Sequence, residues 1–154
     1  MKALDRRVVT LLRVALGVLF IVAAWPKLVD PRGFSDAINH YRLLPVPLER
    51  VAALVLPALE LVVGISLIVG ILDAGASALA LLMLVVFTAA VGVALARGLD
   101  ITCGCFETDG KGPKVGLQKI LENVAMLAVS VGVAWGDRSW LSIADWFRRS
   151  GDIE

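Results

Sequence analysis

Four long apolar segments dominate the sequence and limit the folds that it can adopt. They cover residues 8–25, 51–72, 75–96 and 115–135, and the third carries no charged residue. A helix of about 20 apolar residues, rising 1.5 Å per residue, crosses the hydrocarbon core of a bilayer. Because lipid offers the backbone no hydrogen bonds, a segment inside it must form a helix or join a closed barrel. Their unbroken apolarity favours helices, so we expect an all-α membrane protein, a bundle of four transmembrane helices.

Composition supports this interpretation and narrows the class of protein. The chain of 154 residues is 58% hydrophobic and only 19% charged, whereas soluble domains have about a quarter of their residues charged. A soluble bundle of buried helices is the alternative. The net charge of +1 gives no indication of a nucleic-acid partner. We therefore expect one membrane domain over residues 1–154, with the lipid bilayer as its surroundings.

The four spans define a topology. Both termini lie on one side, and segments 26–50 and 97–114 lie together on the other. Lys and Arg are nearly balanced between the sides, with six on the terminal side and seven on the other. The basic residues before the first span favour cytoplasmic termini. We accordingly expect a protein of the bacterial inner membrane with segment 97–114 outside the cytoplasm. Arg13, inside the first span, should extend to the lipid headgroups on the terminal side.

Two shorter amphipathic helices are predicted in the membrane interface. The first, over residues 31–43, begins with Asp30-Pro31, a helix cap followed by a proline in the first turn. One face of this helix is apolar and carries Phe34, Ile38 and Tyr41. It would either form a lid over segment 97–114 or merely cover the bundle end. The second, over residues 139–149, is predicted to be a membrane anchor.

The only two cysteines stand in one polar loop, DITCGCFETD, as Cys103-Gly104-Cys105. A disulfide between them needs a Cα separation of about 4.4–6.8 Å, which requires a bent backbone that Gly104 permits. Such a small ring would be strained and therefore readily exchanged. As a structural link it would remove almost no chain entropy. We therefore predict that Cys103 and Cys105 are catalytic, one attacking or being attacked by a partner and the other resolving the mixed disulfide.

Two alternatives remain open for the cysteines. Thiolates bind Cu(I) or zinc, but a structural zinc site needs four ligands and the single histidine, His40, would add only one. A copper- or zinc-handling protein would thus need a second chain, and we assign no metal ligands. Alternatively, the cysteines are incidental and the protein is a non-enzymatic assembly or scaffold factor, whose function would survive their replacement.

Two carboxylates, Glu60 and Glu122, fall inside predicted spans. Charges at this depth rarely face lipid, so both should point into the bundle, in the half nearest the cysteines. Glu60 should lie about 13–14 Å below that surface, where Lys27 could reach it along its flexible stem. A proton relay or ligand contact and a structural ion pair are equally compatible with Glu60. For Glu122, Lys119 three residues earlier favours a structural pair.

The spacing of these residues is also similar to that in a known family. The segments Trp25-Pro26-Lys27, Tyr41-Arg42-Leu43-Leu44-Pro45, Leu56-Pro57-Ala58-Leu59-Glu60-Leu61 and Cys103-Gly104-Cys105-Phe106 resemble the MauE branch of the DoxX-like membrane proteins over residues 8–135. The resemblance implies a redox-associated bundle of four helices, linked to maturation of the disulfide-rich methylamine dehydrogenase.

The architecture is also similar to that of the DsbB and VKOR thiol oxidases, which pass electrons from thiols to quinone. Those proteins use a CxxC motif and usually a second cysteine pair, whereas this chain has a single CxC. A thioredoxin-like or cysteine-rich partner must therefore act directly on Cys103 or Cys105. A bound quinone near Glu60 and a homo-oligomeric assembly are further expectations of this interpretation.

Overall fold

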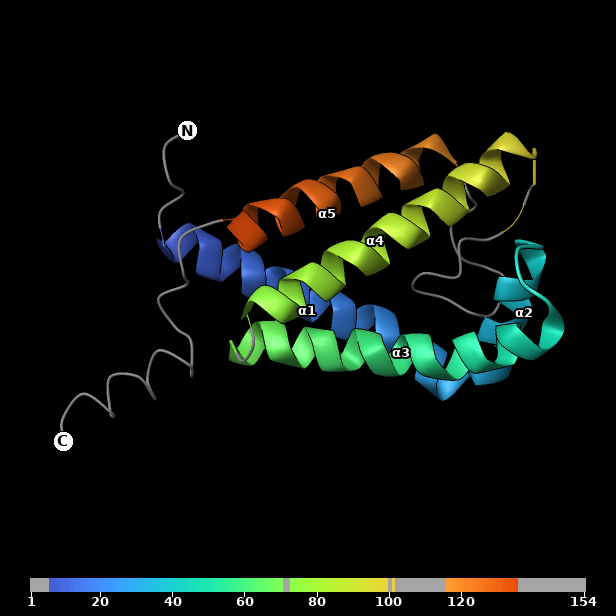
Figure 1. Ribbon diagram of the computed structural model, residues 1–154, viewed down its shortest axis with the longest axis horizontal. Coiled ribbons are helices and arrows are strands. Elements are labelled where there is room, and N and C mark those ends of the chain that lie inside the picture. The colour runs from blue at the N-terminus through green and yellow to red at the C-terminus, as the bar shows by residue number, and fades with distance from the viewer. Residues whose placement is uncertain (1–5, 71–72, 100, 102–115, 136–154) are drawn as a thin grey trace.

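The computed structural model describes residues 6–70, 73–99, 101 and 116–135, and within them it contains five helices and no strand. Four of these helices are long and apolar enough to cross a membrane. The prediction of an all-α bundle with four spans is therefore confirmed. The helices, labelled in Figure 1, are α1 (Arg6–Val29), α2 (Pro31–His40), α3 (Val46–Val69), α4 (Asp73–Ala96) and α5 (Leu117–Trp135).

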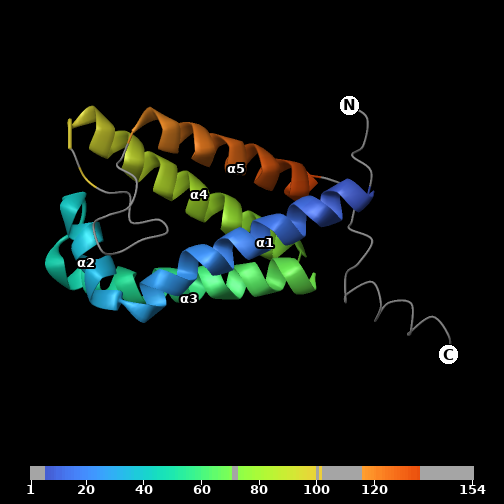
Figure 2. The same cartoon turned by 180° about the vertical axis from the view of Figure 1, so that it is seen from behind.

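The long helices pack as two pairs. α1 makes its most extensive contacts with α3, and α4 makes its most extensive contacts with α5. The two views in Figures 1 and 2 show α2 across one end of the bundle, beside the start of α3. The described segments on either side of residues 102–115 end and begin at this same end. We call it the α2 end.

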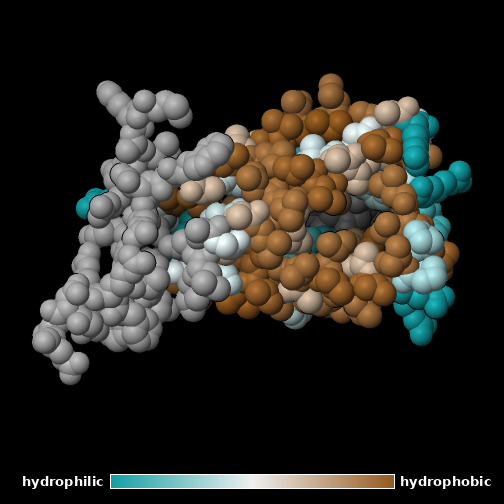
Figure 3. All heavy atoms as spheres, in the orientation of Figure 1, coloured by the Kyte–Doolittle hydropathy of each residue, from teal (hydrophilic) through white to brown (hydrophobic). Residues whose placement is uncertain are grey.

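The outer surface of the bundle is apolar. Leu11, Leu54 and Val62 are 70%, 63% and 59% exposed, and Figure 3 shows hydrophobic residues over most of the visible described surface, with hydrophilic residues gathered at the α2 end. Such an apolar outer surface is suited to contact with lipid. Together with the four long apolar helices, this surface identifies a multi-pass membrane protein.

The backbones of α1 and α3 approach closely at two glycines. A Cβ atom added to Gly64 would lie 2.8 Å from the carbonyl oxygen of Gly17, and one added to Gly17 would lie 2.8 Å from the carbonyl oxygen of Gly64. Small residues permit such contacts between helices in lipid, where association depends on close packing. Gly92 in α4 has no such neighbour within 4 Å. The glycine pair therefore sets the separation of α1 and α3.

Several helix boundaries differ from the prediction because of prolines and a glycine. α1 continues through Pro26 to Val29, since a proline in the last turn removes one hydrogen bond without ending the helix. α3 begins five residues before the predicted residue 51, with Pro47 in its first turn, where a missing N–H has no consequence. It ends before Gly70, which is in the left-handed conformation with φ 75°. The predicted second interfacial helix, 139–149, lies outside the described residues.

Candidate functional site

A buried ion pair joins α1 to α3 below the α2 end. Lys27 Nζ donates hydrogen bonds to Glu60 Oε1 and Oε2 at 2.5 and 2.8 Å. The side chains of Lys27 and Glu60 are only 4% and 15% exposed. The predicted approach of Lys27 to Glu60 is therefore confirmed. Because α3 begins at Val46, Glu60 lies 14 positions into the helix, about 21 Å along its axis, rather than the nine positions expected from a start at residue 51.

The local sequence explains why this lysine faces inward. Lys27 lies on the same face of α1 as Leu16, Phe20 and Ala24, which are at most 7% exposed. These three residues are four positions apart, and Lys27 follows Ala24 by three positions, so all four side chains share one face of the helix. A buried ammonium is tolerated where a carboxylate compensates its charge. In the described part of the chain, Glu60 provides that charge with both of its oxygens.

The short helix α2 covers the ion pair. The ring of Phe34 lies over Lys27, with 5.1 Å between Nζ and the ring centroid, close enough for a cation–π interaction. Phe34 also packs with Ala37, Ala53 and Ile38. The predicted cap is present, since Asp30 Oδ1 accepts a hydrogen bond from the Gly33 N–H at 3.0 Å. The apolar face of α2 thus excludes water from Lys27.

A second polar contact holds α2 against α3. Asn39 Nδ2 donates to Glu49 Oε1 and Oε2, both at 2.9 Å, and Glu49 is only 3% exposed. Sequence reasoning missed Glu49 because it placed the start of the helix at residue 51. An acidic residue following Pro47 is a signal of a first helical turn that could have revealed it.

The end of α2 also contacts the segment that leads to the cysteines. Tyr41 is buried in a cluster with Val91 and Ala94 of α4, and the partly buried hydrophobic residues packed against this cluster include Leu99 and Ile101. Burial raises the pKa of Tyr41 to about 12. The apolar face of α2, predicted from Phe34, Ile38 and Tyr41, does face inward. Tyr41 thereby connects α2 to the residues that precede the cysteine motif.

Comparison with known proteins now identifies the family. The family model described as "Methylamine utilisation protein MauE" matches residues 5–136. The chain belongs to this MauE family. The curated "Methylamine utilization protein MauE" of Paracoccus denitrificans is 37% identical over 126 residues, covering 81% of this chain and 67% of the relative. That of Methylorubrum extorquens is 35% identical over 129 residues, covering 83% and 69%. No solved structure was found to match the chain significantly.

Two other charged residues of this MauE-family protein differ from expectation. Glu122 does not point into the bundle: its side chain is 40% exposed, and its Oε2 lies 2.6 Å from Lys119 Nζ. The predicted structural pair with Lys119 is confirmed, because a partner three residues away on the same helix is within reach. Arg13 does not extend to the headgroups and is 1% exposed, since it falls on the buried face of α1 between Val9 and Leu16.

The predicted catalytic residues, Cys103 and Cys105, lie outside the described residues. The structure therefore leaves their pairing as a prediction. Among residues 6–70, 73–99, 101 and 116–135, no three His, Cys, Asp or Glu side chains are grouped so that they could hold a metal ion. The candidate site accordingly consists of the cysteine motif, known from sequence, and the Lys27–Glu60 pair, which the structure shows in detail.

Proposed function

We propose that this MauE-family protein exchanges disulfides through Cys103 and Cys105 with a thioredoxin-like or cysteine-rich partner outside the cytoplasm. The observation that carries the proposal is the packing of Ile101, two residues before Cys103, against the cluster around Tyr41. The chain entering the cysteine motif is thereby held at the α2 end, above the buried ion pair. An anchored residue shortly before the motif supports the proposal, because groups attached to a helical scaffold are positioned more precisely than groups on free loops.

The exchange balances without any further reactant. A thiolate of the partner attacks one sulfur of the Cys103–Cys105 disulfide, forming a mixed disulfide and releasing the other sulfur as a thiolate. The second thiol of the partner then attacks the mixed disulfide. The partner leaves with a disulfide, and Cys103 and Cys105 have gained two electrons and two protons. The reverse sequence reduces the partner.

Restoring the disulfide after such a cycle requires an oxidant, and we propose a membrane quinone. A quinone accepts the two electrons and two protons that the cysteines release and becomes a quinol. Glu60 is the proposed proton relay or ligand contact for this step, with Lys27 as its counterion. Its support is that the pair is buried below α2 and both carboxylate oxygens contact Lys27.

We infer the partner and the location of this reaction from the names of the relatives and from the predicted topology. The relatives are named for methylamine utilisation, so we propose that the partner is a cysteine-rich protein matured during methylamine use. The proposed location is the inner membrane, with cytoplasmic termini and an extracytoplasmic cysteine loop. A wider relationship to DoxX-like proteins and a homo-oligomeric assembly belong to the same proposal.

Mixed-disulfide trapping tests the exchange. Cells producing the Cys103→Ser or the Cys105→Ser variant are treated with acid to stop exchange, and covalent complexes are resolved on non-reducing gels. The variant that retains the cysteine of the mixed disulfide should attack a disulfide of the partner, as in the reverse sequence, and accumulate a complex that disappears on reduction. The double variant is the matched control and should form none.

Two outcomes would contradict the exchange proposal. If the double variant supports maturation of the partner as well as the native protein does, the protein is a scaffold. If copper or zinc remains bound through purification and is lost from the double variant, the protein handles metal.

A further inference from the structure

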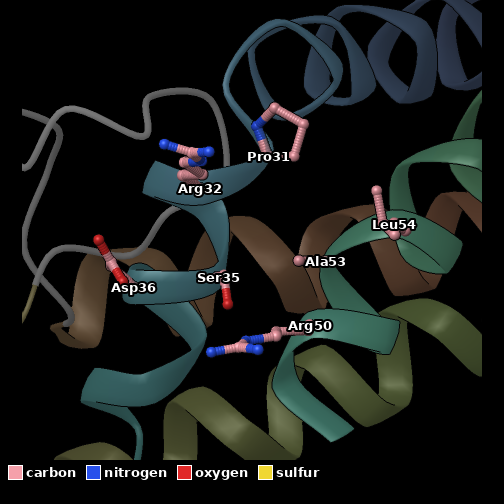
Figure 4. A pocket seen from close by; sticks show the side chains of 7 residues that line it. All are labelled: Pro31, Arg32, Ser35, Asp36, Arg50, Ala53 and Leu54. Carbon is pink, nitrogen blue, oxygen red and sulfur yellow. The ribbon is translucent and has the colours of Figure 1, made fainter. Parts of the chain in front are cut away.

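A pocket of about 520 Å³ lies between α2 and α3 on the surface of the α2 end. Figure 4 shows Arg32, Ser35 and Asp36 on the α2 wall, and Arg50 reaching from α3 toward Ser35. Residues three and four positions apart share one face of a helix, so the three α2 side chains line the same wall. Pro31, Ala53 and Leu54 complete the lining.

The pocket contains two guanidinium groups. Arg32 and Arg50 are exposed, and within the described part of the chain neither makes an ion pair or a side-chain hydrogen bond. Asp36 is exposed as well and has no such partner among the described residues. The pocket therefore offers two cationic groups, a hydroxyl and one carboxylate. Guanidinium groups bind phosphate through paired, charge-assisted hydrogen bonds.

The position of the pocket favours an amphiphilic ligand. Arg50 lies four positions after the first residue of α3, about 6 Å from the end of that helix. One turn farther along the same face, Leu54 is 63% exposed, and Ile65 is 48% exposed at the same face deeper in the span. A polar pocket thus opens directly onto an apolar, lipid-facing strip of α3. A free phosphate would contact only the polar pocket and leave the apolar strip of α3 unused.

We propose that the pocket binds the headgroup of a phospholipid of the phosphatidylethanolamine class. The phosphate lies between Arg32 and Arg50 and accepts a hydrogen bond from the Ser35 hydroxyl, while the ammonium group of the headgroup pairs with Asp36. An acyl chain follows Leu54 along α3. Arginine side chains at the membrane surface attract lipid phosphates, and a pocket between an interfacial helix and a transmembrane helix places them at that depth. This site is independent of the cysteine chemistry, and its lipid braces the face of α2 opposite to the Lys27–Glu60 pair.

Native mass spectrometry of the full-length protein in detergent tests the proposal. The protein is titrated with phosphatidylethanolamine and phosphatidylglycerol that carry identical acyl chains. We expect retention of phosphatidylethanolamine to weaken about tenfold or more in the Arg32→Ala, Arg50→Ala double variant, since each phosphate contact is charge-assisted. Arg97→Ala, which removes one positive charge from the same end outside the pocket, is the matched control and should retain the lipid.

Asp36 supplies a second test that separates headgroup recognition from general attraction to charge. Asp36→Asn should abolish the preference for phosphatidylethanolamine over phosphatidylglycerol while retaining lipid binding. Circular dichroism should show unchanged helix content in every variant, because the replaced side chains are exposed. Equal losses in the Arg97→Ala control and the double variant would overturn the proposal. So would unchanged retention in the double variant, or displacement of the lipid by equimolar glycerophosphoethanolamine, which carries the same headgroup without acyl chains.

Discussion

Replacing only Glu60 should destabilise the bundle far more than replacing both members of the Lys27–Glu60 pair. In Glu60→Gln, the ammonium of Lys27 would stay 4% exposed without its counterion. Breaking a buried pair by removing one partner typically costs about 3–5 kcal/mol. In the double variant Lys27→Met, Glu60→Leu, no charge remains buried, and apolar side chains of similar volume are often neutral or stabilising by about 1–4 kcal/mol.

The cost of neutralising the unpaired side chain sets an upper limit on the stability lost in each single variant. An unpaired lysine can release its proton, and doing so at pH 7 from an ordinary pKa of about 10.4 costs about 4.6 kcal/mol. An unpaired glutamate can take up a proton, which at pH 7 costs about 3.7 kcal/mol from an ordinary pKa of about 4.3. We therefore expect Glu60→Gln to lose about 3–4.6 kcal/mol and Lys27→Met about 3–3.7 kcal/mol.

Unfolding of the purified protein in mixed micelles measures these free energies. Helix content is followed by circular dichroism while the fraction of denaturing detergent is raised, for the native protein, both single variants and the double variant. Loss of less than about 1 kcal/mol in each single variant, with additivity within about 0.5 kcal/mol in the double variant, would refute a buried, coupled pair.

The same double variant separates the two roles of Glu60. If Glu60 relays protons, the stable double variant should exchange thiols but fail to regenerate its disulfide from quinone. Full regeneration would instead make the pair structural alone.

Three further predictions follow from packing and burial. Gly64→Ala should lower stability by about 1–3 kcal/mol, because the new methyl group meets the backbone of α1 at 2.8 Å, while Gly92→Ala should not; equal thermal shifts would contradict the close approach. Burial raises the pKa of the Tyr41 phenol to about 12, so the neutral phenol stabilises the folded state. This contribution is at most about 2.7 kcal/mol; it is fully present below pH 10 and is lost as the pH rises from 10 to 12. Tyr41→Phe should therefore be less sensitive than the native protein over this range in unfolding titrations, and identical pH profiles would count against the buried phenol. Asn39→Ala should lower the free energy of unfolding by about 1–3 kcal/mol, because the buried Glu49 carboxylate would lose its amide donor. Hydrogen exchange should then show faster opening of α2, and unchanged exchange rates would show that this contact does not hold α2 in place.

The spans could be predicted from sequence because lipid leaves few options for an apolar segment. The ends were harder to predict, since the same residue types both begin and end helices. The apolar pattern predicts the start of this span at residue 51, although α3 begins at Val46 with Pro47 in its first turn. That error also hid Glu49. Gly70 ends α3 through its left-handed conformation, a role that composition alone does not reveal.

Charged residues were predictable to the extent that their surroundings were. A carboxylate deep in a span requires a partner, so the pairing of Glu60 with Lys27 could be anticipated from position and stem length. Glu122 also has a partner, but that partner is Lys119 on the same helix, so the pair can form without Glu122 pointing into the bundle. For Arg13, the spacing of buried positions along α1 was the better guide than the general tendency of arginine to reach the headgroups, because helical periodicity aligns Arg13 with Lys27.

The redox state of Cys103 and Cys105 in intact cells shows whether the pair forms an exchangeable disulfide. Thiols are labelled with a membrane-impermeant maleimide before and after an external reductant is added, and the labels are counted by mass shift. We expect no label before reduction and two labels afterwards, because the proposed pair is an exchangeable disulfide outside the cytoplasm. Two labels without any reductant would contradict the disulfide, and labelling that requires permeabilised cells would contradict the topology.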